Sequence, residues 1–84
     1  YNSSAMKKMT CQQLGGACQQ EFSANSFEEI AQLSQEHGKE MFAKGDEAHK
    51  MAMAKMMDLM QNPQEIQAWM AEKRKEFDAL EHID

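Results

Sequence analysis

Apolar and polar residues alternate in two short runs near the start of the chain. Met9 and Cys11 alternate with polar residues in the first run, as do Cys18 and Phe22 in the second. This alternation is typical of half-buried β-strands, and a Gly-Gly pair separates the runs. The pattern predicts a β-hairpin over 7–24 with these four side chains on its apolar face. The hairpin must pack on another element, because an isolated hairpin is marginal in water.

A stripe of helical spacing follows the hairpin. Ser26 and Glu29 predict a capping box, in which Ser26 accepts from the Glu29 amide and Glu29 reaches back to the Ser26 amide. Gly45 is expected to end this helix. Gly38 costs a helix about 1 kcal/mol relative to Ala, so we expect a neighbouring group that needs close approach there. The stripe consists of Phe27, Ile30, Leu33, Ser34, His37 and Met41.

Two further helices are predicted, each with its own start signal. Asp46 is a good N-cap for the first, which contains five methionines between 51 and 60. Asn62 and Pro63 stop that helix and begin the next as N-cap and first helical residue. The short connection favours an antiparallel pair. One face of the last helix carries Ile66, Trp69, Met70, Lys73, Phe77 and Leu80.

The order of elements predicts an α+β fold. An N-terminal β-hairpin packs on a helix in residues 6–45, and a C-terminal antiparallel helical hairpin follows in 46–84. Residues 1–5 are uncharged, precede Met6 and are expected to be the remnant of an expression tag. The 84-residue chain has room for one small domain over 6–84. A domain of this size buries only about two-thirds of its unfolded surface, so a metal or a dimer interface is a plausible supplement.

Charge and motifs exclude several function classes. A net charge of −5, from 9 basic and 14 acidic residues, argues against a nucleic-acid surface. No apolar run approaches the roughly 18 residues of a membrane span, and no secretory signal is visible, so we expect a cytoplasmic protein. The sequence has no phosphate-binding loop, no HExxH and no Ser/His/Asp arrangement, which predicts that it is not an enzyme.

The residues with the most chemical potential are Cys11, Cys18 and His37. The predicted hairpin and helix bring all three toward one junction, and thiolate and imidazole are ligands that Zn²⁺ selects. The spacing alone is weak evidence, because it lacks the tight pair of a zinc knuckle and leaves a fourth position open. Buried apolar cysteines, a hydrogen-bonded histidine and a Cys11–Cys18 disulfide are the alternatives, the last disfavoured in a reducing cytosol.

The block Met9-Thr10-Cys11-Gln12-Gln13-Leu14-Gly15-Gly16-Ala17-Cys18 precedes a capped helix with Glu29 and His37. Together they resemble a family of small bacterial and archaeal proteins of unknown function, labelled predicted small metal-binding proteins. The shared pattern is M-x-C-x-x-L-G-x-x-C and covers residues 7 to about 42. The resemblance implies that Cys11, Cys18 and His37 are metal ligands. Met41 and Phe42 stand where a second family histidine would fall.

Three alternatives exist for the fourth position. Met41 lies one turn after His37 on the same face, and a Cys11/Cys18/His37/Met41 set favours Cu(I). His49 can instead turn inward from the next helix, which keeps zinc as the cofactor. In the third alternative the chain binds no metal and the fold depends on packing alone.

The methionine-rich segment 51–60 supports a hypothesis of a different class. Methionine fills irregular cores and also lines adaptable binding surfaces. The segment is therefore either part of the core between the helices or a surface for a homodimer or a protein partner. The second hypothesis for this chain is a metal-free interaction module that uses this helical face.

Overall fold

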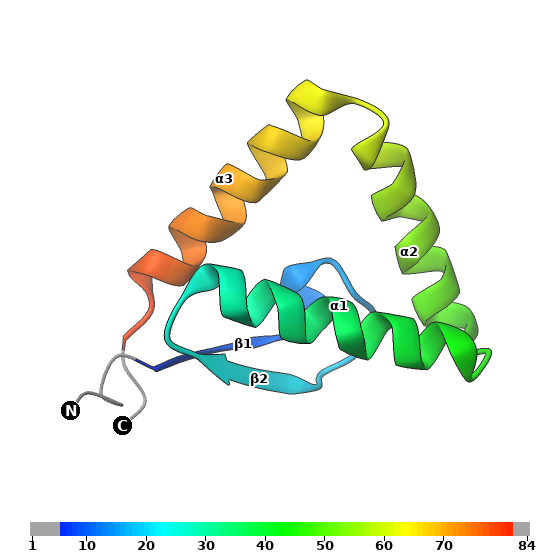
Figure 1. Ribbon diagram of the computed structural model, residues 1–84, viewed down its shortest axis with the longest axis horizontal. Coiled ribbons are helices and arrows are strands. Elements are labelled where there is room, and N and C mark those ends of the chain that lie inside the picture. Colours follow the sequence, from blue (N-terminus) through cyan, green and yellow to red (C-terminus); the bar gives the residue numbers. More distant parts are fainter. Residues whose placement is uncertain (1–5, 82–84) are drawn as a thin grey trace.

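The α+β prediction is confirmed by a computed structural model, which describes residues 6–81. A two-stranded antiparallel sheet is followed by three helices (Figure 1). The residues assigned to an expression tag, 1–5, lie outside the described part of the chain. The elements are β1 (Lys7–Thr10), a 3₁₀ turn η2 (Gln12–Leu14), β2 (Glu21–Ala24), α1 (Phe27–Ala43), α2 (Glu47–Met60) and α3 (Pro63–Ala79).

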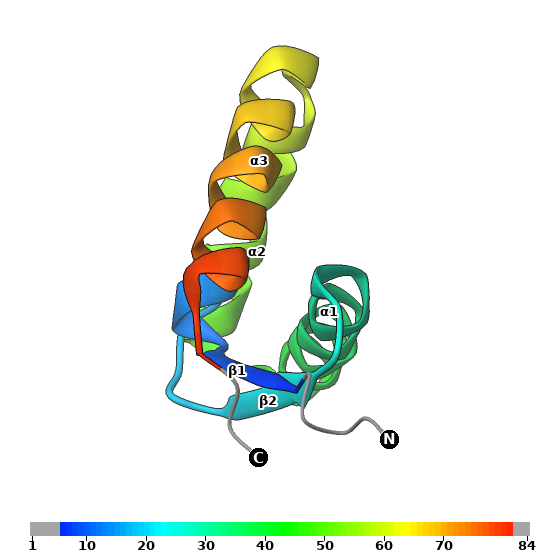
Figure 2. The same ribbon diagram turned by 90° about the vertical axis from the view of Figure 1, so that its left-hand side faces the viewer.

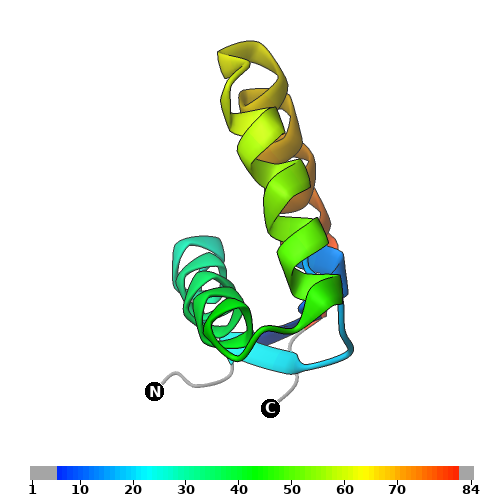
Figure 3. The ribbon, with the colours of Figure 1, turned by 90° about the vertical axis from the view of Figure 1, so that its right-hand side faces the viewer.

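The three helices form the sides of a triangle when the molecule is viewed along its shortest axis (Figure 1). Helix α1 runs beside the sheet, and α2 and α3 run in opposite senses and diverge from the turn that joins them. Seen from either side, α1 is separated from the layer formed by α2 and α3 over most of its length. The two strands lie at the base of both, where they bridge α1 and this layer (Figures 2 and 3). The molecule measures 39 × 31 × 15 Å. Its thin shape leaves much of α2 and α3 in contact with solvent.

The strands are shorter than the alternation predicted. They pair in the register Lys7↔Ala24 to Thr10↔Glu21, so Met9 lies directly opposite Phe22, in agreement with the prediction that both belong to one face. Both cysteines fall in the connection between the strands, because the chain turns into η2 immediately after Cys11. The Gly-Gly pair is therefore part of a wider connection and not a two-residue hairpin turn.

Each helix begins at the residue that its capping signal predicted. Ser26 Oγ accepts from the Glu29 amide at 3.2 Å, and Asn62 caps α3 in front of Pro63. One detail of the capping box was wrong. The Glu29 carboxylate accepts from the Asn25 amide at 3.2 Å and from the Ser26 hydroxyl at 3.3 Å, and not from the Ser26 amide. The Glu29 carboxylate thus bonds to Asn25, the residue before the cap, as well as to the cap residue Ser26.

The core lies between β1, the start of α1 and the end of α3. Ile30 is fully buried, and the rings of Phe27 and Phe77 meet edge to face with centroids 6.2 Å apart. Such an arrangement suits the charge distribution of aromatic rings. The buried apolar cluster is Met9, Leu14, Ala24, Phe27, Ile30 and Phe77, with Phe22, Ala31 and Leu80 packed against it.

Two expectations for α1 were wrong. Leu33 belongs to the predicted stripe but is 38% exposed, and it lies beside residues 23–25 at the end of β2 and not under another helix. Gly38 has no described atom within 4 Å of the position that a Cβ would take, so no neighbour needs its lack of a side chain. The buried part of the stripe is confined to the first turn of the helix, at Phe27 and Ile30.

The methionines of α2 contribute less to the core than a packed helical pair would require. Met51, Met57 and Met60 are each more than half exposed. Met53 and Met56 are half-buried. On α3 the predicted stripe is likewise only partly covered, since Met70 is 40% exposed and Phe77 alone is buried. Much of the apolar surface of α2 and α3 is therefore in contact with solvent.

Polar contacts attach α3 to the rest of the fold. Lys7 Nζ donates to the Asp78 carbonyl at 3.0 Å and lies 5.2 Å from the centre of the Phe77 ring. Arg74 pairs with Glu28 and lies 5.1 Å above the Phe27 ring. These contacts join α3 to β1 and α1 at the same level as the aromatic pair. Within 6–81, no helix is both long and apolar enough to span a membrane.

The position of the core predicts unequal effects for two neighbouring aliphatic residues of α1. We expect Ile30→Ala to lower the free energy of unfolding by about 2–5 kcal/mol, because it leaves a cavity among fully buried side chains. Leu33→Ala is the matched control and should cost less than half as much. Urea denaturation measures both, and equal losses would contradict the described core.

Candidate metal centre

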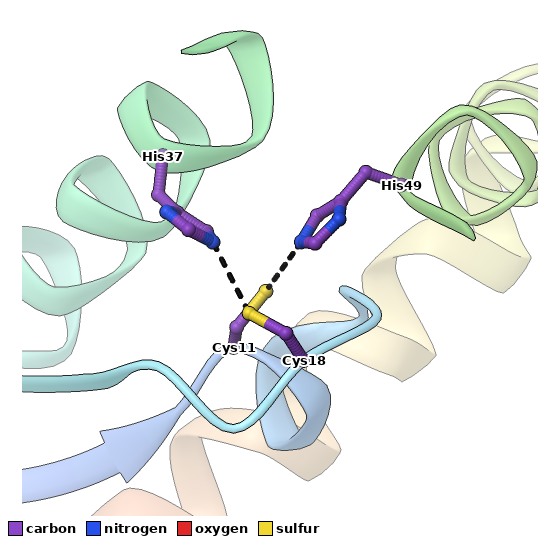
Figure 4. A group of neighbouring side chains, drawn as sticks. All are labelled: Cys11, Cys18, His37 and His49. Carbon is purple, nitrogen blue, oxygen red and sulfur yellow. Dashed lines mark hydrogen bonds between the residues drawn. The ribbon is translucent and has the colours of Figure 1, made fainter. Parts of the chain in front are cut away.

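Four side chains that can ligate a metal converge beside the sheet (Figure 4). Cys11 and Cys18 lie at the two ends of the connection between β1 and β2. His37 comes from α1 and His49 from the first turn of α2. Their ligand atoms, two Sγ and two imidazole nitrogens, all lie within 4.8 Å of one another. These residues are therefore close enough to bind one metal ion, and a bound ion would join both ends of the connection to two helices.

The contacts between the ligand atoms fit a tetrahedral ion. Cys11 Sγ lies 3.6 Å from His49 Nε2, and Cys18 Sγ lies 3.3 Å from His37 Nε2. Zinc bonds of about 2.3 Å to sulfur and 2.0–2.1 Å to nitrogen place neighbouring S and N ligands roughly 3.6 Å apart in a tetrahedron. The two observed thiol–imidazole distances already approach that edge length. Two thiolates and two imidazoles form one of the common ligand sets of structural zinc sites.

The two thiol–imidazole pairs differ in their access to solvent. Cys11 is 1% exposed and His49 is 3% exposed, whereas Cys18 and His37 are half-buried. Both cysteines are free thiols. Burial raises the pKa of the Cys11 thiol above its ordinary value, although backbone hydrogen bonds involving Cys18 and Ala17 act in the opposite direction. Burial thus favours the neutral thiol of Cys11, whereas a bound cation favours the thiolate.

The backbone between the cysteines is fixed by hydrogen bonds at both ends. The Cys11 carbonyl accepts from the amides of Leu14 and Gly16, at 3.1 and 2.8 Å. The Cys11 amide donates to the Gln20 carbonyl at 2.7 Å, and the Gln12 amide donates to the Cys18 carbonyl at 2.9 Å. These bonds hold the two cysteines near each other although the strands have ended.

Both glycines of the connection are required by their surroundings. Gly15 has φ +95°, and a Cβ there would lie 3.0 Å from Trp69 Cζ2 and 3.1 Å from Met56 Sδ. It therefore sits directly against side chains of both α2 and α3. At Gly16 a Cβ would overlap with the Sγ atom of Cys11 and would lie 3.0 Å from the Cys11 carbonyl oxygen. Only glycine leaves room for the Cys11 thiol in its present position.

Asp46 connects the cap of α2 to the site. Its Oδ2 atom accepts from the His49 amide at 3.0 Å and contacts His49 Nδ1 at 2.6 Å. The ring hydrogen bond holds the pKa of the Asp46 carboxyl below its usual range, and the bond from the His49 amide acts in the same direction. A single carboxylate oxygen thus serves as the N-cap of the helix and as the partner of the imidazole.

Aromatic contacts place the ring of His37. It packs edge to face against Phe22, with centroids 5.5 Å apart, and against the ring of His49 at 5.2 Å. These contacts direct Nε2 toward Cys18 (Figure 4). The His37 ring thus contacts two aromatic rings and the Cys18 thiol, whereas the His49 ring lies beside a carboxylate.

The structure brings together the three residues identified at the junction, Cys11, Cys18 and His37, and adds His49 as the fourth. Of the two alternatives for the fourth position, His49 has its Nε2 beside a cysteine thiol. Met41 is half-buried on α1, and its carbonyl accepts from the Asp46 amide at 3.1 Å.

Two residues of the site were not recognised in the sequence as such. Asp46 was recognised as a helix cap but not as a partner of His49, although the spacing Asp-x-x-His was a usable signal. An N-cap side chain reaches the third helical residue, so a histidine there lies next to it. Gly16 was assigned to a turn, and its contact with the Cys11 thiol had no signal in the sequence.

Comparisons with protein-family models, curated proteins and solved structures found no match to this chain.

The contact between Gly16 and Cys11 predicts a specific effect of one added methyl group. We expect Gly16→Ala to displace the Cys11 thiol, destabilise the connection and weaken binding of Zn²⁺ by at least tenfold. Gly38→Ala is the matched control, since open space surrounds it and alanine favours the helix by about 1 kcal/mol. Zinc titration monitored by calorimetry and thermal unfolding measure both. Wild-type affinity in Gly16→Ala would show that the thiol position is not constrained.

Proposed function

We propose that this chain is a small zinc-binding protein whose centre is formed by Cys11, Cys18, His37 and His49. The observation that carries the proposal is the convergence, within 4.8 Å, of four soft and borderline ligand atoms from the β1–β2 connection and two helices. Chance clusters of exposed acidic groups are common, but two cysteines and two histidines form the ligand set that zinc prefers.

The role that fits this site best is structural. Four protein ligands fill a tetrahedral ion and leave no open position for a substrate or an activated water, unlike the three-ligand sites of zinc enzymes. We therefore propose no catalytic activity. The buried apolar cluster is small, and an ion that joins the cysteine connection to α1 and α2 adds stabilisation where packing is limited.

The choice of zinc over copper follows from the fourth ligand. With Met41 the set contains a thioether and favours Cu(I), whereas with His49 it contains two imidazoles and suits Zn²⁺. The contact between His49 Nε2 and the Cys11 thiol supports the second set. The resemblance of residues 7–42 to predicted small metal-binding proteins supports the same proposal, with His49 in the place of the histidine expected near Met41.

Metal content tests this proposal directly. Native mass spectrometry of freshly purified protein should show one zinc ion per chain, lost on treatment with a chelator. The variant Cys11→Ser/Cys18→Ser should contain no zinc, and His37→Ala and His49→Ala should each bind more weakly, because each removes one of four ligands.

Met41→Leu is the control for the copper alternative and should keep wild-type zinc binding. Loss of metal in Met41→Leu with retention in His49→Ala would assign the fourth position to Met41. A metal-free chain that is two daltons lighter than expected would instead indicate a Cys11–Cys18 disulfide and would contradict the proposal.

The exposed methionines of α2 favour a second candidate function. Met51, Met57 and Met60 are 64%, 62% and 55% exposed, and all three belong to α2. Unbranched thioether side chains adapt to varied partners, so a solvent-exposed set of them suits an interaction surface. In this second candidate the chain self-associates or binds a protein partner through α2.

The response of stability to metal separates the two candidates. If zinc crosslinks the fold, saturation at 1,000 times the dissociation constant should raise the free energy of unfolding by about 4 kcal/mol, and a chelator should reverse the gain. If α2 is an interaction surface without a metal, unfolding should be indifferent to chelator and the native mass should rise with protein concentration. Urea denaturation and mass spectra on the same samples measure both.

A further inference from the structure

The two histidines of the candidate centre are held differently. His49 Nδ1 lies 2.6 Å from the Asp46 carboxylate, and the same oxygen accepts from the His49 amide at 3.0 Å. His37 has the rings of Phe22 and His49 as its neighbours. One ligand is thus oriented by a charge-assisted hydrogen bond and the other by edge-to-face packing.

The contact with Asp46 determines which nitrogen of His49 carries the proton. A carboxylate can only accept, so a bond at 2.6 Å requires the proton to be on Nδ1. In the neutral ring Nε2 then keeps its lone pair, and this atom lies beside Cys11 Sγ at 3.6 Å. The free imidazole otherwise exchanges its proton between the two nitrogens, and one of these forms cannot ligate through Nε2.

The bond from the His49 amide fixes the position of the Asp46 carboxylate, and this carboxylate in turn sets the direction of the His49 ring. Asp46 is the N-cap of α2, and its position follows from the bond that its side chain accepts from the third helical residue. That residue is His49 itself, which is 3% exposed. The cap, the ring and the ligand atom are therefore parts of one rigid unit at the start of the helix.

We propose that Asp46 is a positioning residue of the metal centre, which holds His49 in the Nδ1–H tautomer with Nε2 directed at the site. His49 Nε2 is then directed at the site, beside the Cys11 thiol, before any metal binds. This inference rests on the proposed zinc function and assigns a role to a residue that does not itself ligate.

Three variants separate positioning from helix capping and from charge. Asp46→Ser keeps an N-cap hydroxyl for the His49 amide but is too short to reach the ring. Asp46→Asn keeps both the cap and a side-chain carbonyl that can accept from Nδ1–H, while the negative charge is lost. Asn62→Ser is the matched control, because it makes the same kind of cap replacement on α3, where Asn62 accepts from the amides of Gln64 and Glu65.

The tautomer is read in the metal-free protein from the ¹⁵N shifts of the His49 ring. We expect the Nδ1–H form in wild type and Asp46→Asn, and a shift toward the Nε2–H form in Asp46→Ser. Zinc affinity in Asp46→Ser should fall about 10–100-fold, while Asp46→Asn stays nearer to wild type. Asn62→Ser should change neither quantity, even if it lowers thermal stability, because a cap has no effect on a distant ring.

Each contrary result has a distinct meaning. An unchanged His49 tautomer and zinc affinity in Asp46→Ser would overturn the proposal, as would equal losses in Asp46→Ser and Asp46→Asn, which would indicate an effect of charge. If wild type binds no zinc, the proposed function fails, and the tautomer measurement still decides whether Asp46 orients His49.

Discussion

The space that Gly16 leaves for the Cys11 thiol is the constraint around which this small fold is arranged. With the thiol in that space, the Cys11 carbonyl accepts from two amides of the connection and its own amide closes the pairing with Gln20. These hydrogen bonds fix the connection between β1 and β2. Helices α2 and α3 contact this connection at Gly15, through Met56 and Trp69. Both helices therefore contact the segment that carries the cysteines, in addition to their contacts with each other and with α1.

This arrangement explains why the molecule is open and thin while its candidate centre is compact. Helices α2 and α3 diverge from their joining turn (Figure 1), and at Gly15 each meets the connection through one side chain, Met56 or Trp69. Apolar burial is concentrated where Phe27, Ile30 and Phe77 meet. A metal at the four-residue centre would stabilise the second half of α1, at His37, because the fully buried residues of that helix are confined to its first turn.

Local signals in the sequence were sufficient for the elements and insufficient for their mutual arrangement. The caps at Ser26, Asp46 and Asn62 located all three helix starts, because a cap depends on only a few neighbouring residues. The exposure of Leu33 and Met70 was not predictable in this way, since periodicity reports which face is apolar but not how far a partner helix follows it. Convergence of His49 with Cys11, 38 residues away, depends on the turn at Gly45 and on the diverging helices.

The order of the four ligands along the chain has a consequence for how the protein folds. The two cysteines close one short loop of chain and the two histidines, in adjacent helices joined through Gly45, close another. The entropic cost of closing a loop rises only with the logarithm of its length, and local contacts form early in folding. The two cysteines can therefore come together independently of the two histidines. Binding of one ion by both pairs would then join the β1–β2 connection to α1 and α2 in a single step.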